Sequence, residues 1–253
     1  MDGLTAGVDI GSRTTAAVLA LGGKLVGSAL VETGTQPQDV GKKALQKALY
    51  DFGEKAPRKM VTTGYGRFQF SSSDTVSEIT CQARGSSHLF PKAAMVVDIG
   101  GQDSKVILVR KGKAIDFAMN DKCAAGTGRF LEMMAQALGV SLHEFIALAG
   151  RGKEGVRLSS TCAVFAESEL ISLVAAGKKP EDIARAVAGA VARRVMGLIR
   201  RVGLQRPLVL TGGVARNAAI VDALSAELGF TPLVPTEPQL TCALGAALIA
   251  AQG

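Results

Sequence analysis

The sequence contains no tryptophan, two tyrosines and two histidines, and aromatic residues make up only 4% of its 253 residues. With so few large rings, the interior has to be packed from aliphatic helices and strands. The 30 glycines are then available where the backbone turns sharply or approaches a ligand. A length near 250 with 47% apolar residues fits either one large core or two modest ones.

Cysteine is also scarce, and the four cysteines stand at positions 81, 123, 162 and 242. They are too few and too widely spaced for a secreted disulfide scaffold. No basic segment followed by an apolar run opens the sequence, and glycine or charge interrupts every apolar stretch short of the ~18 residues that a membrane span needs. We therefore expect a protein of the reducing cytoplasm, with no signal peptide and no contact with a membrane.

Two common nucleotide-binding motifs are missing as well. The sequence has neither the lysine-bearing P-loop nor the Gly-x-Gly-x-x-Gly dinucleotide fingerprint. The formal charge of +7 comes from lysines and arginines that are interleaved with acidic residues rather than clustered. This pattern favours nucleotide phosphate or an acidic protein partner over nucleic acid.

Apolar periodicity divides the chain into alternating strands and helices. Strands are expected at residues 6–10, 14–21, 24–31, 59–63, 95–99, 104–109, 113–119, 208–210 and 231–234. Helices are expected at residues 37–52, 76–89, 128–138, 141–149, 163–176, 180–201, 216–228 and 240–250.

An internal repeat organises these elements. Val-Asp-Ile-Gly at residues 8–11 recurs 89 residues later at 97–100, and two further strands follow each copy. The sequence therefore predicts an α/β protein of two duplicated halves, residues 1–92 joined by the C-terminal helix 240–253, and residues 93–239. We expect a hinge between the halves and a ligand in the cleft that they form.

Each copy of the repeat ends in a turn suited to phosphate. In the first, Gly11 lets backbone N–H groups approach an anion, Ser12 and Thr14 offer hydroxyls, and Asp9 can hold a hydrated magnesium ion. In the second, Asp98, Gly100, Gly101 and Gln102 repeat the pattern, and the Gln102 amide can orient an attacking water without titrating. One such turn often only closes a hairpin, but two at matching positions favour a nucleotide site.

A third glycine turn comes after the apolar strand at residues 208–210. Gly212 and Gly213 would let a flat group such as adenosine lie against backbone, and Asn217 comes shortly after them. A simple strand-to-helix turn explains this segment equally well. With the P-loop and the dinucleotide fingerprint absent, the three turns together favour the actin-like ATPase architecture.

The cysteines separate into two pairs. A free cysteine is most often a small buried hydrophobe, which is our interpretation for Cys81 and Cys242. Cys123 and Cys162 each begin a helix-like segment, where free N–H groups would lower the pKa of a thiol and stabilise an anionic cluster. An iron–sulfur cubane takes four thiolates, so this pair would supply half the ligands in a symmetric dimer.

Three long motifs resemble a known family. They are Asp-Ile-Gly-Gly-Gln-Asp from residue 98, Asn-Asp-Lys-Cys-Ala-Ala-Gly-Thr-Gly from residue 120, and Ser-Ser-Thr-Cys-Ala-Val-Phe-Ala-Glu-Ser-Glu from residue 159. Over essentially its whole length, the chain resembles ATP-dependent activators of 2-hydroxyacyl-CoA dehydratases. The same group includes ATPase subunits of benzoyl-CoA reductase and reductases of double-cubane proteins.

This resemblance implies a homodimer with one [4Fe-4S] cluster bridged by Cys123 and Cys162 of each subunit. It also implies a site for ATP and Mg²⁺. The residues of that site would be Asp9, Gly11, Ser12, Asp98, Gly100, Gly101, Gln102, Gly126, Thr127, Gly128, Gly212 and Gly213. Related proteins place a small residue and a lysine where this chain has Arg13 and Ala16, so Arg13 is the candidate for the cation beside the phosphate.

The resemblance implies a function as well, ATP hydrolysis coupled to transfer of one low-potential electron. The partners would be an acceptor iron–sulfur enzyme, of the dehydratase or double-cubane type, and a ferredoxin or flavodoxin as electron donor. Two alternatives stay open: a small-molecule kinase on the actin-like fold, and a redox-inert nucleotide-binding regulator. A kinase would need a carboxylate base facing a substrate hydroxyl, and no persuasive candidate stands in the sequence.

Overall fold

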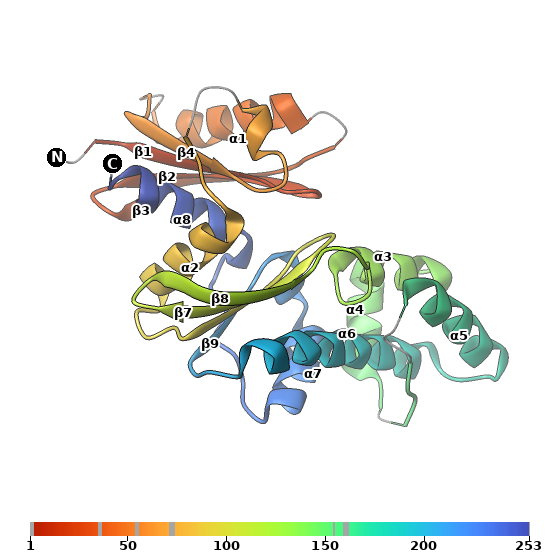
Figure 1. Ribbon diagram of the computed structural model, residues 1–253. Helices are drawn as coiled ribbons and strands as arrows, with labels where there is room; N and C mark the ends of the chain where they lie inside the picture. The colour runs from red at the N-terminus through yellow and green to blue at the C-terminus, as the bar shows by residue number, and fades with distance from the viewer. Residues whose placement is uncertain are drawn as a thin grey trace. The chain divides into compact units, whose positions relative to one another are not determined.

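The computed structural model describes residues 3–34, 37–53, 56–70, 74–153, 155–158 and 162–252. Ser159, Ser160 and Thr161 of the third motif lie outside the described residues. The strands and α-helices, shown in Figure 1, are β1 (Thr5–Ile10), β2 (Thr14–Leu21), β3 (Lys24–Glu32), α1 (Pro37–Phe52), β4 (Lys59–Thr63), β5 (Asp74–Thr75), α2 (Glu78–Leu89), β6 (Met95–Ile99), β7 (Ser104–Arg110), β8 (Lys113–Asn120), α3 (Gly128–Ala137), α4 (Leu142–Arg151), α5 (Ala163–Ala175), α6 (Pro180–Val202), β9 (Leu208–Thr211), α7 (Ala218–Leu228) and α8 (Thr241–Ala250).

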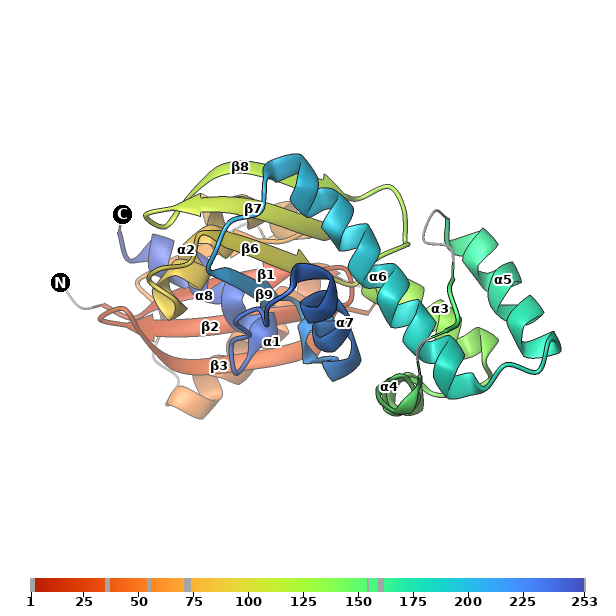
Figure 2. The same ribbon diagram turned by 90° about the horizontal axis from the view of Figure 1, so that it is seen from below.

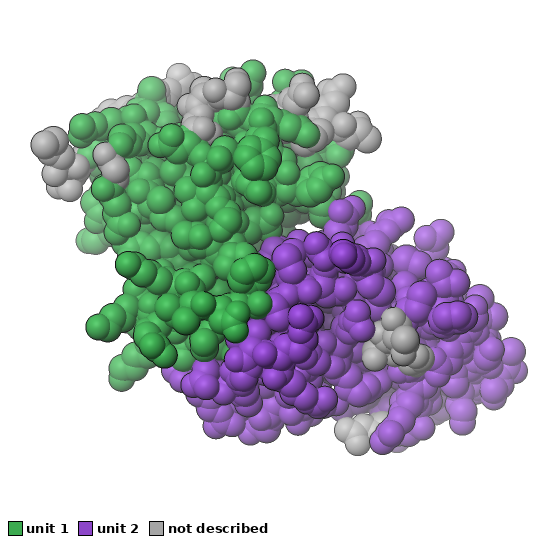
Figure 3. All heavy atoms as spheres, viewed as in Figure 1, with its two compact units in different colours: residues 1–96, 107–117, 235–253 green, residues 97–106, 118–234 purple. Residues whose placement is uncertain are grey.

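These elements form two compact units, which Figure 3 distinguishes by colour. Unit 1 consists of residues 1–96, 107–117 and 235–253, and unit 2 of residues 97–106 and 118–234. Unit 1 is therefore built from three separate segments of the chain. The domain limits expected from the sequence stay a prediction.

The sheet of unit 1 has the strand order β3-β2-β1-β4-β5. β1 pairs antiparallel with β2 and parallel with β4, so Asp9 and Thr63 are partners at the carboxyl ends of two parallel strands. Ligands bind characteristically at that edge of an α/β sheet. The first glycine turn of the sequence comes directly after β1 there.

Helices cover both faces of this sheet, as Figure 1 shows. On β2, Ala17 and Leu19 pack in one core cluster with residues of α1, whereas Ala16, Val18 and Ala20 pack with residues of α8. This alternation results from the two-residue period of a strand. α8 is buried along almost its whole length, as its uniformly apolar sequence requires.

The second sheet has the strand order β8-β7-β6-β9. In unit 2 the long helix α6 packs against α7 and α4, and Figure 2 shows α6 running beside α7. α6 begins with Pro180, Glu181 and Asp182 and ends with Arg200 and Arg201, charges that complement the helix dipole at each end. Twelve of its side chains are buried.

The strand predicted at residues 231–234 is wrong. Only Leu233 pairs, in an isolated parallel bridge with Val209. Pro232 and Pro235 flank that bridge and carry no N–H group, so a longer ladder cannot form there. The helix predicted from residue 216 begins two residues later in the structure, at Ala218, and a 3₁₀ turn, Gly213–Arg216, precedes it.

Within the described part of the chain, no single helix is both long enough and apolar enough to cross a membrane. Helices α3 and α4 have the length and apolar composition of a membrane span only when they are taken together, and the chain bends by 87° between them. Both helices bury side chains inside the protein, including Phe130 and Phe145.

Candidate functional site

The first glycine turn, Asp9–Thr14, is closed by a hydrogen bond from Gly11 N to Thr14 O of 3.1 Å. A Cβ atom on Gly11 would lie 2.7 Å from that carbonyl oxygen, so glycine is required by close approach. The Thr33 hydroxyl donates to Gly11 O at 2.8 Å and ties β3 to the turn. Ser12 is half-buried and Arg13 is exposed, so both side chains can reach a ligand at this turn.

A second loop, Gly64–Gly66, packs against Asp9 in unit 1. Gly64 has φ +90°, and a Cβ there would lie 2.4 Å from Asp9 Oδ1. Gly66 N donates to Ile10 O at 2.9 Å, which fixes this loop on the end of β1. The half-buried Asp9 carboxylate is thus held beside backbone, and its oxygens have the chemistry that Mg²⁺ prefers.

The second glycine turn, Asp98–Ser104, repeats the first at the level of single hydrogen bonds. Gly100 N donates to Asp103 O at 3.0 Å, the same three-residue closure as between Gly11 and Thr14. Asp98 is buried and Gln102 is exposed. The predicted water-orienting amide is therefore on the open side of the turn.

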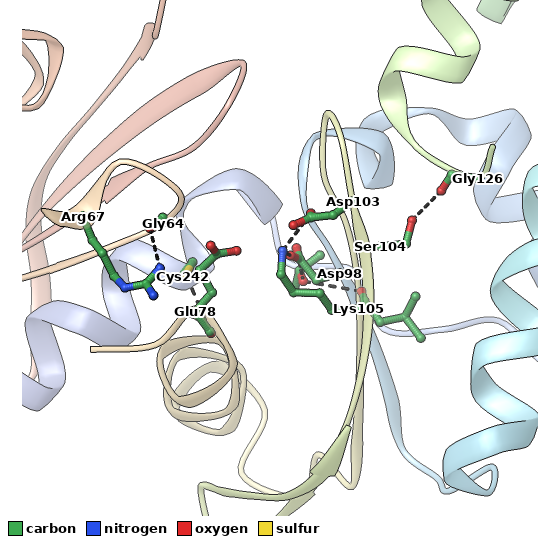
Figure 4. A network of polar contacts seen from close by, with 11 residues as sticks. Gly64, Arg67, Glu78, Asp98, Asp103, Ser104, Lys105, Gly126 and Cys242 are labelled. Atoms are coloured by element: carbon green, nitrogen blue, oxygen red, sulfur yellow. Dashed lines mark hydrogen bonds and ion pairs between the residues drawn. The ribbon is translucent and has the colours of Figure 1, made fainter. Parts of the chain in front are cut away.

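Lys105 is buried beside this turn and neutralises part of its negative charge (Figure 4). Its Nζ donates to Asp103 Oδ1 at 2.7 Å and lies 3.7 Å from Asp98 Oδ2. The Lys105 side chain is 5% exposed and that of Asp98 is 9% exposed. Buried charges are tolerated when they are paired and hydrogen-bonded, so this ion pair fixes both carboxylates of the turn.

The third glycine turn lies directly against the second. Gly212 has φ +86°, and a Cβ there would lie 2.4 Å from Ile99 O and 2.8 Å from Asp98 Oδ1. The Thr211 hydroxyl donates to Asp98 Oδ1 at 3.0 Å. Unit 2 thus brings Asp98 and Gly212 together, while Gly213 is exposed.

Asn217 has a structural task in this segment. Its Oδ1 accepts hydrogen bonds from Ala219 N at 3.0 Å and Ile220 N at 3.4 Å and so caps α7. The side chain is 4% exposed. Its predicted role in nucleotide binding stays a prediction.

Cys123 is not at a helix N-terminus, contrary to the sequence-based expectation. α3 begins at Gly128 with Thr127 as its N-cap residue, so Cys123 lies in the preceding loop. The reason is local: Gly126 has φ +89°, and the Asn120 amide donates to Cys123 O at 2.9 Å and to Ala125 O at 3.0 Å. These bonds hold residues 120–126 in a compact non-helical loop.

Cys162 does stand at a helix N-terminus, as expected. It is the N-cap residue of α5, and Ala166 N donates to Cys162 O at 3.0 Å. Both Cys123 and Cys162 are half-buried free thiols, which leaves their sulfur chemistry open to a ligand. Among the residues that the structure describes, no group of three or more His, Cys, Asp and Glu side chains could hold a metal ion.

Cys123 and Cys162 of one chain could therefore supply only half of the ligands that an iron–sulfur cluster needs. Two thiols of one chain have the right chemistry, and a cubane takes four. Cys81 and Cys242 are not candidates, because both are buried in the core cluster around Val61 and Ala246. A hydrogen bond with Cys81 and burial raise the pKa of the Cys242 thiol well above its ordinary value.

Comparison with known proteins decides the family. The BadF/BadG/BcrA/BcrD ATPase family matches residues 6–250. The chain belongs to this family. It is 46% identical over 251 residues to the activator of lactoyl-CoA dehydratase from Anaerotignum propionicum, covering 97% of this chain and 96% of that protein.

Two solved structures of family relatives align over nearly the whole chain. The (R)-2-hydroxyglutaryl-CoA dehydratase component A of Acidaminococcus fermentans has a TM-score of 0.95 at 39% identity, covering 98% of both chains. The activator of the 2-hydroxyisocaproyl-CoA dehydratase from Clostridium difficile, with bound ADPNP, has a TM-score of 0.90 at 43% identity and covers 98% and 94%. The predicted family and its actin-like ATPase fold are both confirmed.

Sequence reasoning gave no role to several residues that hold the glycine turns and the cysteine-bearing loop in place. Lys105 carries a signal that could have revealed it: a lysine inside an otherwise apolar strand, two residues after Asp103. Asn120 stands at the end of β8, immediately before the cysteine-bearing loop. Gly64 and Thr211 gave no such signal, because their importance depends on neighbours far away in the sequence.

Proposed function

We propose that this chain is an ATP-hydrolysing iron–sulfur protein that activates a 2-hydroxyacyl-CoA dehydratase or a related reductase component by giving it one low-potential electron. The observation that carries the proposal is its full-length similarity to proteins named as dehydratase activators. The presence of both half-buried thiols, Cys123 and Cys162, supports the redox part.

The ATP site in this proposal uses the three glycine turns. The N–H groups of Gly11 and Gly100 close their own turns, so these two glycines would let the neighbouring backbone approach the phosphate, and the Gly101 N–H would bind a phosphate oxygen. Ser12, Arg13 and Thr14 would add side-chain donors. Asp9 would hold hydrated Mg²⁺ through its carboxylate. Gly212 and Gly213 would support the adenosine, and Gly126, Thr127 and Gly128 would close the phosphate side.

Hydrolysis then needs a positioned water rather than a strong base. The exposed amide of Gln102 would accept a hydrogen bond from that water and orient it toward the terminal phosphate, yielding ADP and phosphate. The Asp98 carboxylate is held by Lys105 and by the Thr211 hydroxyl, so its orientation is fixed before substrate arrives.

Cys123 and Cys162 of each of two chains would supply the four thiolates of one [4Fe-4S] cluster in a homodimer. When bound, such a cluster takes up one electron from a ferredoxin or flavodoxin and releases it to the acceptor. The chain's own contribution is to present these thiols at a partly open surface. We expect the protein to work in the cytoplasm.

Anaerobic purification tests the redox part of the proposal. The wild type should be brown and dimeric, with about four iron atoms per two chains. Cys123→Ser should lose the iron and its absorbance while still binding nucleotide, and Cys242→Ser, which changes a buried core thiol, should keep them. A colourless, iron-free wild type that folds, or iron retained in Cys123→Ser, would refute the ligand assignment.

The ATPase part has its own test. Gln102→Ala should slow ATP turnover more than it weakens nucleotide binding, because the amide acts on the water rather than on the nucleotide. The matched control is Gln136→Ala on the exposed face of α3. Unchanged turnover in Gln102→Ala would remove that residue from the mechanism.

A further inference from the structure

The loop that carries Cys123 is fastened to the second glycine turn. We call Asp98–Ser104 the phosphate turn and Asn120–Gly128 the cysteine loop. The Ser104 hydroxyl donates to Gly126 O, a contact drawn in Figure 4, and Gly128 N donates to Gly100 O at 2.9 Å. Arg129 N donates to Gly101 O at 2.8 Å.

Two of these bonds, those from Gly128 N and Arg129 N, involve the first N–H groups of α3, which have no partner inside the helix itself. Carbonyl groups of the phosphate turn satisfy two of them. The Gly100 carbonyl shares its planar trans peptide with the Gly101 N–H, which points to the opposite side. Phosphate bound at Gly101 N–H would therefore pull on the same rigid plane that holds the start of α3, and hydrogen bonds in such a chain strengthen one another.

Inside the cysteine loop, the Asn120 amide fixes the backbone at Cys123 and at Ala125. Its two amide hydrogens go to Cys123 O and Ala125 O, which uses the full donor capacity of the side chain. Asn120 is 8% exposed. The Thr127 hydroxyl adds a bond to Ala124 O at 2.6 Å. The loop is thus internally rigid as well as externally attached.

We propose that Ser104 and Asn120 are positioning residues that make the Cys123 backbone move with the phosphate turn, so that nucleotide at the turn changes the environment of the Cys123 thiol. This proposal rests on the proposed function for the identities of the nucleotide and the iron–sulfur cluster. The hydrogen-bonded link between the phosphate turn and the cysteine loop, however, is a property of the chain without a cluster. Cys162 receives the signal less directly, because α5 packs against α3 and α6.

The link can be measured without a cluster. In the full-length, iron-free protein, the rate at which a maleimide labels Cys123 is monitored by peptide mass spectrometry, with and without a non-hydrolysable ATP analogue and Mg²⁺. In the wild type we expect nucleotide to change this rate by about fivefold or more, the lower range of typical coupling between sites. Affinity for a fluorescent ATP analogue is measured in parallel.

Ser104→Ala and Asn120→Ala, each labelled at a nucleotide concentration that saturates that variant, should reduce the nucleotide effect on labelling toward onefold. Ser104→Ala removes one oxygen atom, so it tests the link even where Asn120→Ala lowers stability. Ser168→Ala is the control, because its hydroxyl bonds only within α5, to Val164 O, at 3.3 Å. It should keep the wild-type response.

A wild-type nucleotide effect that persists in Ser104→Ala and Asn120→Ala overturns the proposal, as does a wild type that binds nucleotide with no change in Cys123 labelling. Failure of the proposed function is distinguishable. It would show as absent iron in the anaerobic preparation, a measurement that leaves the labelling experiment intact.

Discussion

Helices α2 and α8 approach so closely that one added methyl group should separate them. Gly245 on α8 faces the backbone of α2, where a Cβ would lie 1.9 Å from Cys81 O and 2.9 Å from Gly85 N. The approach from α2 to α8 is equally close, because a Cβ on Gly85 would lie 2.0 Å from Thr241 O. We therefore predict that Gly245→Ala is strongly destabilising.

The size of the effect can be worked out from these distances. Ordinary van der Waals contact begins near 3.4 Å, so the helices would have to move apart by about 1.5 Å, and neither obstacle is a side chain that can rotate away. Overpacking of a tight core costs about 1–3 kcal/mol, and backbone obstacles place this case at the upper end. The helix-propensity gain of about 1 kcal/mol for Gly→Ala offsets only part of that.

Gly197→Ala is the matched control, and it should change the free energy of unfolding in the opposite direction. Gly197 lies within α6 and is exposed, and a Cβ there meets nothing within 4 Å. Replacing it should stabilise by about 1 kcal/mol through helix propensity alone.

Thermal melting monitored by far-UV circular dichroism measures both variants. For a chain of this length we expect Gly245→Ala to lower the Tm by about 4–8 °C and Gly197→Ala to raise it by about 2–4 °C. If Gly245→Ala melted at or above the wild-type temperature, the close packing of α2 on α8 would be refuted.

Three further predictions concern single side chains. Lys105→Met should cost about 3 kcal/mol in urea unfolding, because it leaves the buried Asp98 carboxylate without its cation, whereas the exposed Lys113→Met should be nearly neutral. Equal losses in the two variants would contradict the buried ion pair. The hydrogen bond with Cys81 and burial raise the pKa of Cys242, so the unfolded state loses this proton first and stability should fall as the pH rises above about 8.5. Cys242→Ala should flatten that fall, and an unchanged pH profile would speak against the raised pKa. Asn217→Ala should cost about 1 kcal/mol by thermal melting through loss of the α7 cap, while Asn217→Asp should nearly preserve stability; equal effects would exclude capping.

Local sequence patterns predicted most of the elements. The bounds of α1 and β4 agree with the predicted ones, because apolar spacing and the flanking glycines or prolines determine such segments locally. The two repeated glycine turns were predictable for the same reason. Their closing hydrogen bonds span three residues, from Gly11 to Thr14 and from Gly100 to Asp103, so similar local sequence gives the same geometry.

Contacts between distant segments were not predictable in this way. Cys123 looked like the start of a helix, but the side chain of Asn120 and the positive φ of Gly126 help to keep it in a loop. Thr211 meets Asp98 from 113 residues away. Such pairs depend on how sheets and helices assemble, which no window of a single sequence contains.

The order in which a ribosome produces the chain conflicts with the order in which unit 1 is assembled. Strand β2 emerges early, yet the face formed by Ala16, Val18 and Ala20 is covered by α8, which follows all the other helices and strands described. A nascent chain therefore carries an exposed apolar face on this sheet until α8 has been synthesised. We expect deletion of residues 241–250 to lower the yield of folded protein severely, because it leaves this apolar face uncovered.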